Sequence, residues 1–516
     1  MRKKAFYNII SSLVLQSVML ITNFVLPHLI IHNYGSSING LITSITQFLS
    51  FVVLLESGIG GVVLVKYYDA LATNDSIKMS QIYKESKKFF NIIAYITIIY
   101  VIILCIIFPY IVKNNTSSRF TVTALILIIS TTYLTQYFFG LVNQLVIQAD
   151  QKTYIINFTK SIANLISTIL IALFIFLKAD IILVKSVGAI ALVSIPVVFS
   201  VYVKKNYNIN HNIERNKSIL SDKWNGLGQH IATFIHGNAD IVLLTLFSGV
   251  LEVSVYSVYA LITSGMHSVQ AALSNGVSAA FGNMIANGEN KKVKKYYIAF
   301  DYLNMLIFSV LFTVAFFMIL PFLRLYTNGA TDINYIRPLY AAIVLVADYL
   351  YCVRCSYSCI IFAAGHFRQT MKNSYIEAVI NIVISLLLVN KYGLVGVGIG
   401  TLAAMAFRSI DYIRYLSKNI IFWDIKKTAY KYIINIIAFT IVFMCVRGLK
   451  FDQINSIRQW IVYAVITTLI TVSVYLTINF VLNKNEITAV YKLYVQPLIG
   501  KMTRRLKKVN YESNHH

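Results

Sequence analysis

Long apolar stretches alternate with short polar segments along the whole chain of 516 residues. A helix needs roughly 20 consecutive apolar residues to cross a bilayer core, and fourteen of the stretches approach or exceed that length. The predicted spans are 8–32, 40–65, 89–112, 120–147, 154–177, 180–203, 228–248, 255–281, 297–322, 336–363, 374–390, 394–413, 430–447 and 459–482. Because polar breaks such as Asn114–Ser118 and Lys178–Asp180 separate stretches that can each span alone, we predict an all-α polytopic membrane protein with about 14 transmembrane helices.

The basic residues follow a second pattern, which orients the chain. With the amino terminus taken as inside, the inner segments carry 32 of the 45 Lys and Arg residues and the outer loops carry nine. This bias predicts a cell membrane protein with both termini in the cytoplasm. The net charge of +25 then reflects topology and contact with anionic lipids. Nucleic acid is not an expected partner, because no soluble basic domain is predicted.

The loops between the spans are short. None is longer than about 25 residues, and we find no Gly-rich phosphate loop with a lysine. These features argue against an enzyme, so we predict no catalytic residue, metal or cofactor. The energy for transport would come from an ion gradient, the membrane potential or the gradient of the substrate. The glycine run 393–400 and the Cys352-x2-Cys355-x3-Cys359 stripe are interpreted as helix-packing faces.

The first six spans recur at an offset of about 215–217 residues. One of the matches pairs Asn23-Phe-Val-Leu with Asp240-Ile-Val-Leu, 217 positions later. A parallel repeat implies two six-helix lobes related by a pseudo-two-fold axis along the membrane normal. We therefore predict a first lobe over 1–205, a second lobe over 206–416, two extra spans within 417–482 and a basic cytoplasmic tail over 483–516.

Three short motifs near the amino terminus accompany the fourteen spans: Asn23-x3-Pro27, Gly35-x3-Asn39-Gly40-Leu41 and Glu56-Ser-Gly58-Ile-Gly60. Together they resemble the polysaccharide (O-antigen, Wzx-type) flippases of the multidrug/oligosaccharidyl-lipid/polysaccharide exporter (MOP) superfamily. The resemblance implies a flippase that moves an undecaprenyl-pyrophosphate-linked oligosaccharide from the inner to the outer leaflet by alternating access. A polysaccharide polymerase and glycosyltransferases would be its partners in the pathway.

Relatives within the same superfamily stay open as alternatives. Lipid II flippases also have fourteen spans, but they carry basic residues in the first span, where this chain has Asn23, His28 and His32. Multidrug/cation antiporters usually have twelve spans. Teichoic-acid-type exporters cannot be separated from polysaccharide flippases on these residues.

Charged residues within spans are the candidates for binding, because a charge in hydrocarbon costs at least ~2.5 kcal/mol. Four basic residues lie within spans and away from their ends: Lys160, Lys185, Arg354 and Arg408. A guanidinium matches the oxygens of a pyrophosphate and stays protonated. We predict that Arg354, Arg408, Lys160 and Glu56 bind the substrate. The alternatives are a local pair between Arg408 and the residue three positions later, Asp411, and lysines that snorkel to the interface.

A second candidate set follows from the resemblance to lipid II flippases, which have a cation site on the corresponding three spans. In this sequence the matching oxygen-bearing residues are Asp240, Glu377, Asn381 and Thr401. Hard cations prefer oxygen ligands, so these residues would hold Na⁺, or a proton on a carboxylate, as the coupling ion. The alternative is hydrogen bonding between helices.

Overall fold

The computed structural model describes residues 2–56, 59–113, 115–210, 212–214, 234, 237–422 and 424–496. Every regular element in these ranges is a helix, which confirms the predicted all-α class. A helix satisfies its own backbone hydrogen bonds, and hydrocarbon offers no other partner for them. The first part of the predicted seventh span and the tail beyond residue 496 lie outside the described residues.

The chain divides into two compact units. The first consists of Met1–Leu261, Thr327–Asn334 and Ser385–Val397, and the second of Ile262–Tyr326, Tyr335–Ile384 and Gly398–His516. The lobe boundaries expected at residues 205 and 416 stay predictions.

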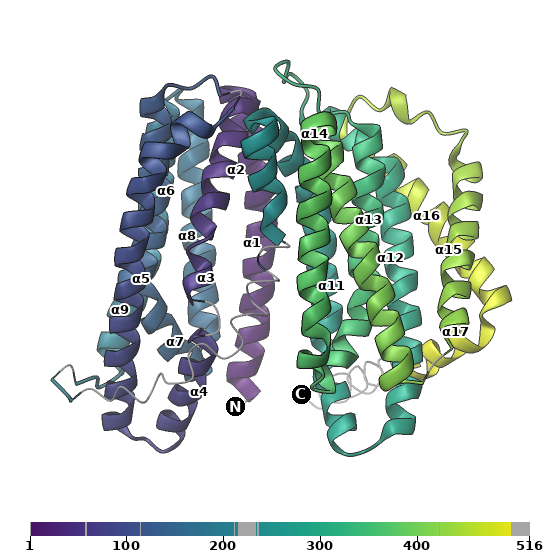
Figure 1. Ribbon diagram of the computed structural model, residues 1–516, viewed down its shortest axis with the longest axis horizontal. Coiled ribbons are helices and arrows are strands. Elements are labelled where there is room, and N and C mark those ends of the chain that lie inside the picture. The colour runs from purple at the N-terminus through teal and green to yellow at the C-terminus, as the bar shows by residue number, and fades with distance from the viewer. Residues whose placement is uncertain are drawn as a thin grey trace, which may run out of the picture. The chain divides into compact units, whose positions relative to one another are not determined.

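The helices follow one another closely along the chain (Figure 1). Their bounds are α1 Arg2–Tyr34, α2 Ser36–Ser50, α3 Val53–Glu56, α4 Ile59–Ala72, α5 Ser76–Ile111, α6 Arg119–Thr135, η1 Gln136–Gly140, α7 Leu141–Ala149, α8 Thr153–Phe176, α9 Ile181–Asn206, η3 Leu244–Ser248, α11 Val250–Ala286, α12 Asn290–Tyr326, α13 Pro338–Ala363, α14 Phe367–Asn419, α15 Ile425–Val446, η4 Phe451–Gln453, α16 Ile457–Leu482, α17 Lys484–Val490 and η5 Tyr491–Val495.

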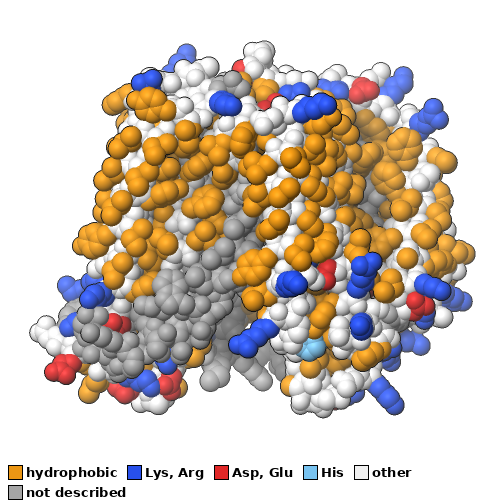
Figure 2. Space-filling model, viewed as in Figure 1, with side chains coloured by type: hydrophobic (Ala, Val, Ile, Leu, Met, Phe, Trp, Pro, Cys, Tyr) orange, Lys and Arg blue, Asp and Glu red, His pale blue; other side chains and the backbone are white. Residues whose placement is uncertain are grey.

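Eleven of the described helical stretches are long and apolar enough to cross a membrane. Their outward side chains are apolar as well: Ile99 on α5, Ile169 on α8 and Ile190 on α9 are each at least 60% exposed. Figure 2 shows hydrophobic side chains over the middle of the helices on one face, with Lys and Arg near the helix ends. This distribution is that of a multi-pass membrane protein, with lipid rather than water around the middle of each helix.

The remaining predicted spans have identifiable counterparts. The eleventh and twelfth spans form one helical element, α14, which is 53 residues long and broken at Gly393 (φ 52°, ψ −127°). The seventh span appears as the shorter apolar helix Gly237–Ser248. The eighth lies in α11, whose apolar character is interrupted by residues such as His267, Gln270 and Asn275.

Two features of the backbone recur along the chain, at an offset slightly shorter than the predicted 215–217 residues. Gly35 (φ 86°, ψ 167°) precedes α2, and Gly249 (φ 94°, ψ 171°) precedes α11, in nearly the same conformation 214 positions later. The long helices α5 and α12 begin at Ser76 and Asn290, again 214 positions apart. Positive φ favours glycine. Glycine therefore recurs at the equivalent position of the repeat because the turn recurs.

A very close helix crossing in the first unit depends on Gly40 of α2. A β-carbon placed on Gly40 would lie 1.7 Å from the carbonyl oxygen of Val250, at the start of α11. The neighbouring Asn39 amide donates to Ser254 Oγ at 2.8 Å and to Ser257 Oγ at 3.0 Å. Small residues at helix crossings and hydrogen bonds between helices are the main sources of helix association in lipid, where apolar burial contributes little.

We predict that Gly40→Ala lowers the stability of the protein in detergent by about 1–3 kcal/mol, because the added methyl group must push α2 and α11 apart. Thermal unfolding followed by intrinsic fluorescence measures the change. Gly61→Ala on α4 is the matched control, since its β-carbon meets no described atom within 4 Å. Equal melting temperatures for the two variants would show that the crossing tolerates a side chain at residue 40.

Candidate functional site

The densest group of buried charges lies on α13 and α14, in the second unit. Arg354 Nη1 lies 2.6 Å from Glu377 Oε1, and Arg408 Nε lies 3.4 Å from Glu377 Oε2. Arg408 Nη1 also lies 3.0 Å from Asp411 Oδ2. Arg354, Glu377 and Arg408 are 7%, 6% and 1% exposed. Two guanidinium groups and two carboxylates form a neutral cluster, which lowers the cost of keeping each charge away from water.

Arg408 is held by neutral partners as well as by carboxylates. It donates to the carbonyl oxygen of Thr370 at 3.1 Å, to Ser374 Oγ at 2.6 Å and to Tyr412 OH at 2.9 Å. A guanidinium has five N–H donors, and most of those of Arg408 are used within this network. The ion pair with Asp411 is thus one contact within a larger network, and the role of Arg408 in substrate binding stays a prediction.

The break in α14 brings the members of this cluster together. Glu377 lies before Gly393 and Arg408 lies after it, so a straight helix would place them about 46 Å apart at 1.5 Å per residue. The chain reverses at Gly393, where the positive φ suits glycine. The two halves of α14 then lie against each other, and the cluster is a consequence of that reversal.

The predicted substrate-binding residues have different environments. Arg354 and Arg408 are both engaged by Glu377. Lys160 on α8 is half-buried, and it has no ion-pair partner among the described residues. Glu56 ends α3, and its Oε2 atom is buried without a hydrogen-bond partner in the described part of the chain. Of the predicted basic groups, Lys160 has the fewest competing contacts for an anionic ligand.

The predicted cation-binding residues are divided between the units. Asp240 belongs to the first unit and is buried there, whereas the other three belong to the second unit. Asn381 Nδ2 donates to Thr401 Oγ1 at 3.2 Å, so a hydrogen bond joins the two halves of α14. Glu377 already contacts two arginines, and it would have to release one of them to serve as a ligand for a cation.

The structure contains two further charged pairs that the sequence does not predict. Lys431 Nζ of α15 lies 2.8 Å from Asp301 Oδ2 of α12, and Ser356 of α13 donates to the same carboxylate at 2.8 Å. His267 Nε2 of α11 lies 2.9 Å from Asp348 Oδ1 of α13. Lys431 is the second residue of the predicted span 430–447, where a lysine is expected to reach the membrane surface, so the sequence does not predict its burial. The sequence holds one indication of this pair. Asp301 is the lone acidic residue in the predicted ninth span, and a buried carboxylate needs a cationic partner.

Comparisons with known proteins match one segment of the chain by family model and most of the chain by fold. The MatE family model matches residues 228–387. A solved structure of the lipid II flippase MurJ in an inward closed conformation is 15% identical, with a TM-score of 0.67 over 93% of this chain and 100% of the flippase. An inward-facing multidrug resistance MATE family transporter of the MOP superfamily is 14% identical, with a TM-score of 0.59 over 79% of this chain and 98% of the transporter.

The chain has the fold that this lipid II flippase and this MATE family transporter share. An outward-facing MATE family structure gives a TM-score of 0.55 at 14% identity, over 81% of this chain and 95% of that one. A search of curated proteins finds no match. The fold confirms the prediction of a polytopic membrane protein, and the solved proteins that share it are transporters and a flippase. The choice of substrate within the superfamily stays a prediction.

We predict that Glu377→Ala destabilises the protein by about 3–5 kcal/mol, because it leaves buried guanidinium groups without their shared carboxylate. Adding Arg354→Ala should restore part of the loss, since Arg408 still has Asp411. The melting temperatures of the two single variants and the double variant in detergent measure this coupling.

The exposed pair of Arg324 and Asp452, 3.2 Å apart, supplies the control. Asp452→Ala should change stability by less than about 1 kcal/mol, because solvent screens that pair. A double variant whose loss equals the sum of the losses of Glu377→Ala and Arg354→Ala would contradict the buried network.

Proposed function

We propose that the protein flips an undecaprenyl-pyrophosphate-linked oligosaccharide from the inner to the outer leaflet of the cell membrane, with both termini in the cytoplasm. Alternating access would carry the head group, driven by an ion gradient or the membrane potential. The transporter fold supports this class of activity. The observation that carries the proposal of a lipid-linked substrate is an apolar cavity in the second unit.

This cavity, of about 400 Å³, lies among α12, α13, α15 and α16. Phe312, Phe316 and Phe439 contribute to its lining, and the polar groups are a few hydroxyls and one amide. Val346 and Ile436, also among its lining residues, are 48% and 64% exposed, so the cavity opens on the side of the unit that faces lipid. Such a surface suits part of a polyprenyl chain better than a soluble cationic drug.

The extent of the alignment with solved structures also favours a flippase over a drug transporter. The lipid II flippase aligns with 93% of this chain, whereas the multidrug transporters with TM-scores above 0.5 align with 79–81%. That same alignment supports lipid II as a second candidate substrate. Both candidates combine a polyprenyl chain, a pyrophosphate and sugars, so a test with both lipids separates them.

The pyrophosphate needs a cation, and we propose Lys160 for this role. Arg354 and Arg408 share the carboxylate of Glu377, whereas Lys160 has no ion pair in the described part of the chain. Asp240, Asn381 and Thr401 stay candidates for the coupling ion. Transport that responds to a Na⁺ or pH gradient would support a coupling ion.

We predict that Lys160→Ala lowers the initial rate of flipping at least tenfold in proteoliposomes, while Lys160→Arg keeps most of it, because the positive charge meets the pyrophosphate. The assay uses fluorescent undecaprenyl-pyrophosphate oligosaccharide, lipid II and ethidium as alternative substrates. Lys391→Ala, at the end of the first half of α14, is the control. Equal rates for Lys160→Ala and the unaltered protein would refute the role of this lysine.

We also predict that Val346→Trp, which fills the mouth of the cavity, slows the flipping of long polyprenyl substrates more than that of short-chain analogues. Val465→Trp on α16 is the control, since Val465 is 53% exposed and does not line the cavity. The ratio of the rates for the two chain lengths is the measurement. An unchanged ratio in Val346→Trp would show that the lipid chain does not use this cavity.

A further inference from the structure

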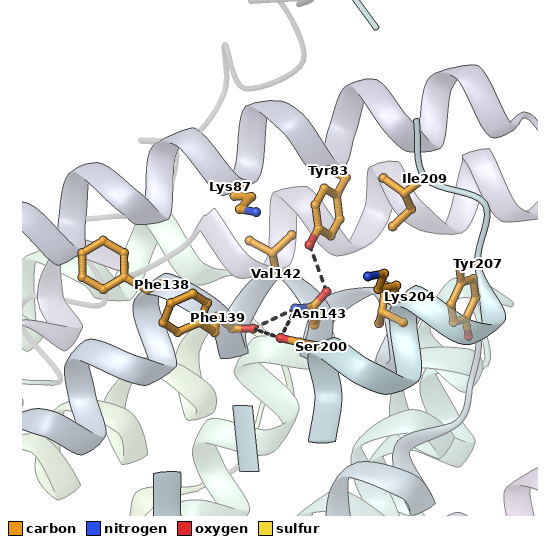
Figure 3. A pocket seen from close by; sticks show the side chains of 11 residues that line it. Tyr83, Lys87, Phe138, Phe139, Val142, Asn143, Ser200, Lys204, Tyr207 and Ile209 are labelled. Carbon is orange, nitrogen blue, oxygen red and sulfur yellow. Dashed lines mark hydrogen bonds between the residues drawn. The ribbon is translucent and has the colours of Figure 1, made fainter. Parts of the chain in front are cut away.

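A second cavity, of about 390 Å³, lies in the first unit and is separate from the charged cluster on α13 and α14. Its walls come from α5, from η1 with α7, and from α9 with the segment that follows it (Figure 3). None of its lining residues belongs to the predicted substrate or cation sets.

The floor of the cavity is a fixed polar network. Tyr83 OH donates to Asn143 Oδ1 at 3.1 Å, and Asn143 Nδ2 donates to Ser200 Oγ at 3.0 Å and to the carbonyl oxygen of Phe139 at 2.7 Å. Tyr83 and Asn143 are buried. These groups form hydrogen bonds with one another, so they give the floor its shape. The selection of a ligand then depends on the charged groups at the rim.

Two lysines supply those charges. Lys87 of α5 and Lys204 of α9 are exposed, and in Figure 3 both ammonium groups turn toward the hydrogen bond between Tyr83 and Asn143. Neither lysine has an ion-pair partner within the described ranges, and no carboxylate is among the described residues that line the cavity. A pair of ammonium groups over neutral donors and acceptors suits a phosphate.

The ion pairs next to Tyr207, at one end of the cavity, involve neither Lys87 nor Lys204. Tyr207 OH donates to Asp150 Oδ2 at 2.8 Å, and Lys4 and Lys152 lie 3.0 Å and 2.7 Å from the same carboxyl group. Burial raises the pKa of Asp150, but the hydrogen bonds from Lys152, Lys4 and Tyr207 outweigh it and lower the pKa overall. Asp150 thus stays ionised near neutral pH, with its charge balanced by two other lysines.

The remaining lining is apolar and continues toward the middle of the membrane. Phe138 and Val142 line the cavity, and farther along the flanking helices Ile96 of α5 and Val197 of α9 are 43% and 53% exposed. Phe138 lies in η1, a π-helical turn, whereas α13, which corresponds to this region in the repeat, is a regular α-helix. π-helical turns often mark functional sites.

The depth of the site indicates its environment. Helix α5 has 36 residues and is therefore about 54 Å long, far more than the ~30 Å hydrocarbon core. Its first turns belong to the basic segment 66–88, and Lys204 begins the basic segment 204–226; both segments are predicted to be on the inner side. The two ammonium groups then lie at the level of the inner head groups.

We propose that this cavity binds an anionic phospholipid of the inner leaflet as a ligand that is not transported. Its phosphodiester lies between Lys87 and Lys204 over the Tyr83–Asn143–Ser200 floor. Its acyl chains follow the apolar surfaces of α5 and α9. The site is a lipid-binding surface on the first unit, distinct from the route proposed for the flipped substrate.

The test is the stabilisation of the full chain in detergent by added lipid. Phosphatidylglycerol should raise the melting temperature more than phosphatidylcholine does. In the double variant Lys87→Gln/Lys204→Gln, binding of phosphatidylglycerol should weaken about 30-fold, which corresponds to ~1 kcal/mol for each lysine. Glycerol phosphate, which lacks acyl chains, should give no shift.

The control is Lys88→Gln/Lys205→Gln, which removes the same charge from the next residue on each helix without touching the lining. It should bind phosphatidylglycerol as the unaltered protein does. Equal weakening in both double variants would overturn the proposal in favour of general surface attraction. Equal binding of phosphatidylcholine would overturn the charge selection, and displacement by equimolar undecaprenyl phosphate would reassign the cavity to the transported lipid.

Discussion

The carboxylate of Glu377 faces two guanidinium groups in a part of the protein that water hardly reaches. A buried arginine without a partner is so costly that the fold around it must supply one. That requirement links α13 to both halves of α14, and it depends on the reversal at Gly393. The same constraint explains why Lys431 and Asp301 meet between α15 and α12. Charge neutrality inside the second unit thus determines which helices must stay together.

Much of the fold could be predicted because the membrane imposes a simple rule on the sequence. Long apolar stretches became helices, and the repeat reappeared as glycines with matching backbone angles at residues 35 and 249. The break at residue 393 was anticipated only as a short loop between two spans. The structure adds that the two halves of α14 carry complementary charges, which a linear pattern of apolar residues does not reveal.

The candidate site was harder to predict, because pairing depends on distances between residues that are far apart in the sequence. Arg354 and Arg408 were expected to face a ligand, but the position of Glu377 could not be known before the helices were placed. Lys431 lies at the edge of a predicted span, where the sequence favours a side chain that reaches the membrane surface over a buried one. The π-helical turn at Gln136–Gly140 leaves no trace in the periodicity, so the cavity beside it was also hidden.

The apolar cavity among α12, α13, α15 and α16 opens sideways, past Val346 and Ile436. For the lipid-linked substrate that we propose, a sideways opening would let the long hydrocarbon tail stay in the lipid while its polar end crosses the membrane. For a chain of about 55 carbons, at ~0.8 kcal/mol per CH₂, full exposure to water would cost roughly 40 kcal/mol. No ion gradient in a cell supplies that much energy for a single crossing. If the tail stays out of water, only the sugars and the phosphates have to be moved across the membrane. The free energy required is then that of transporting a polar solute.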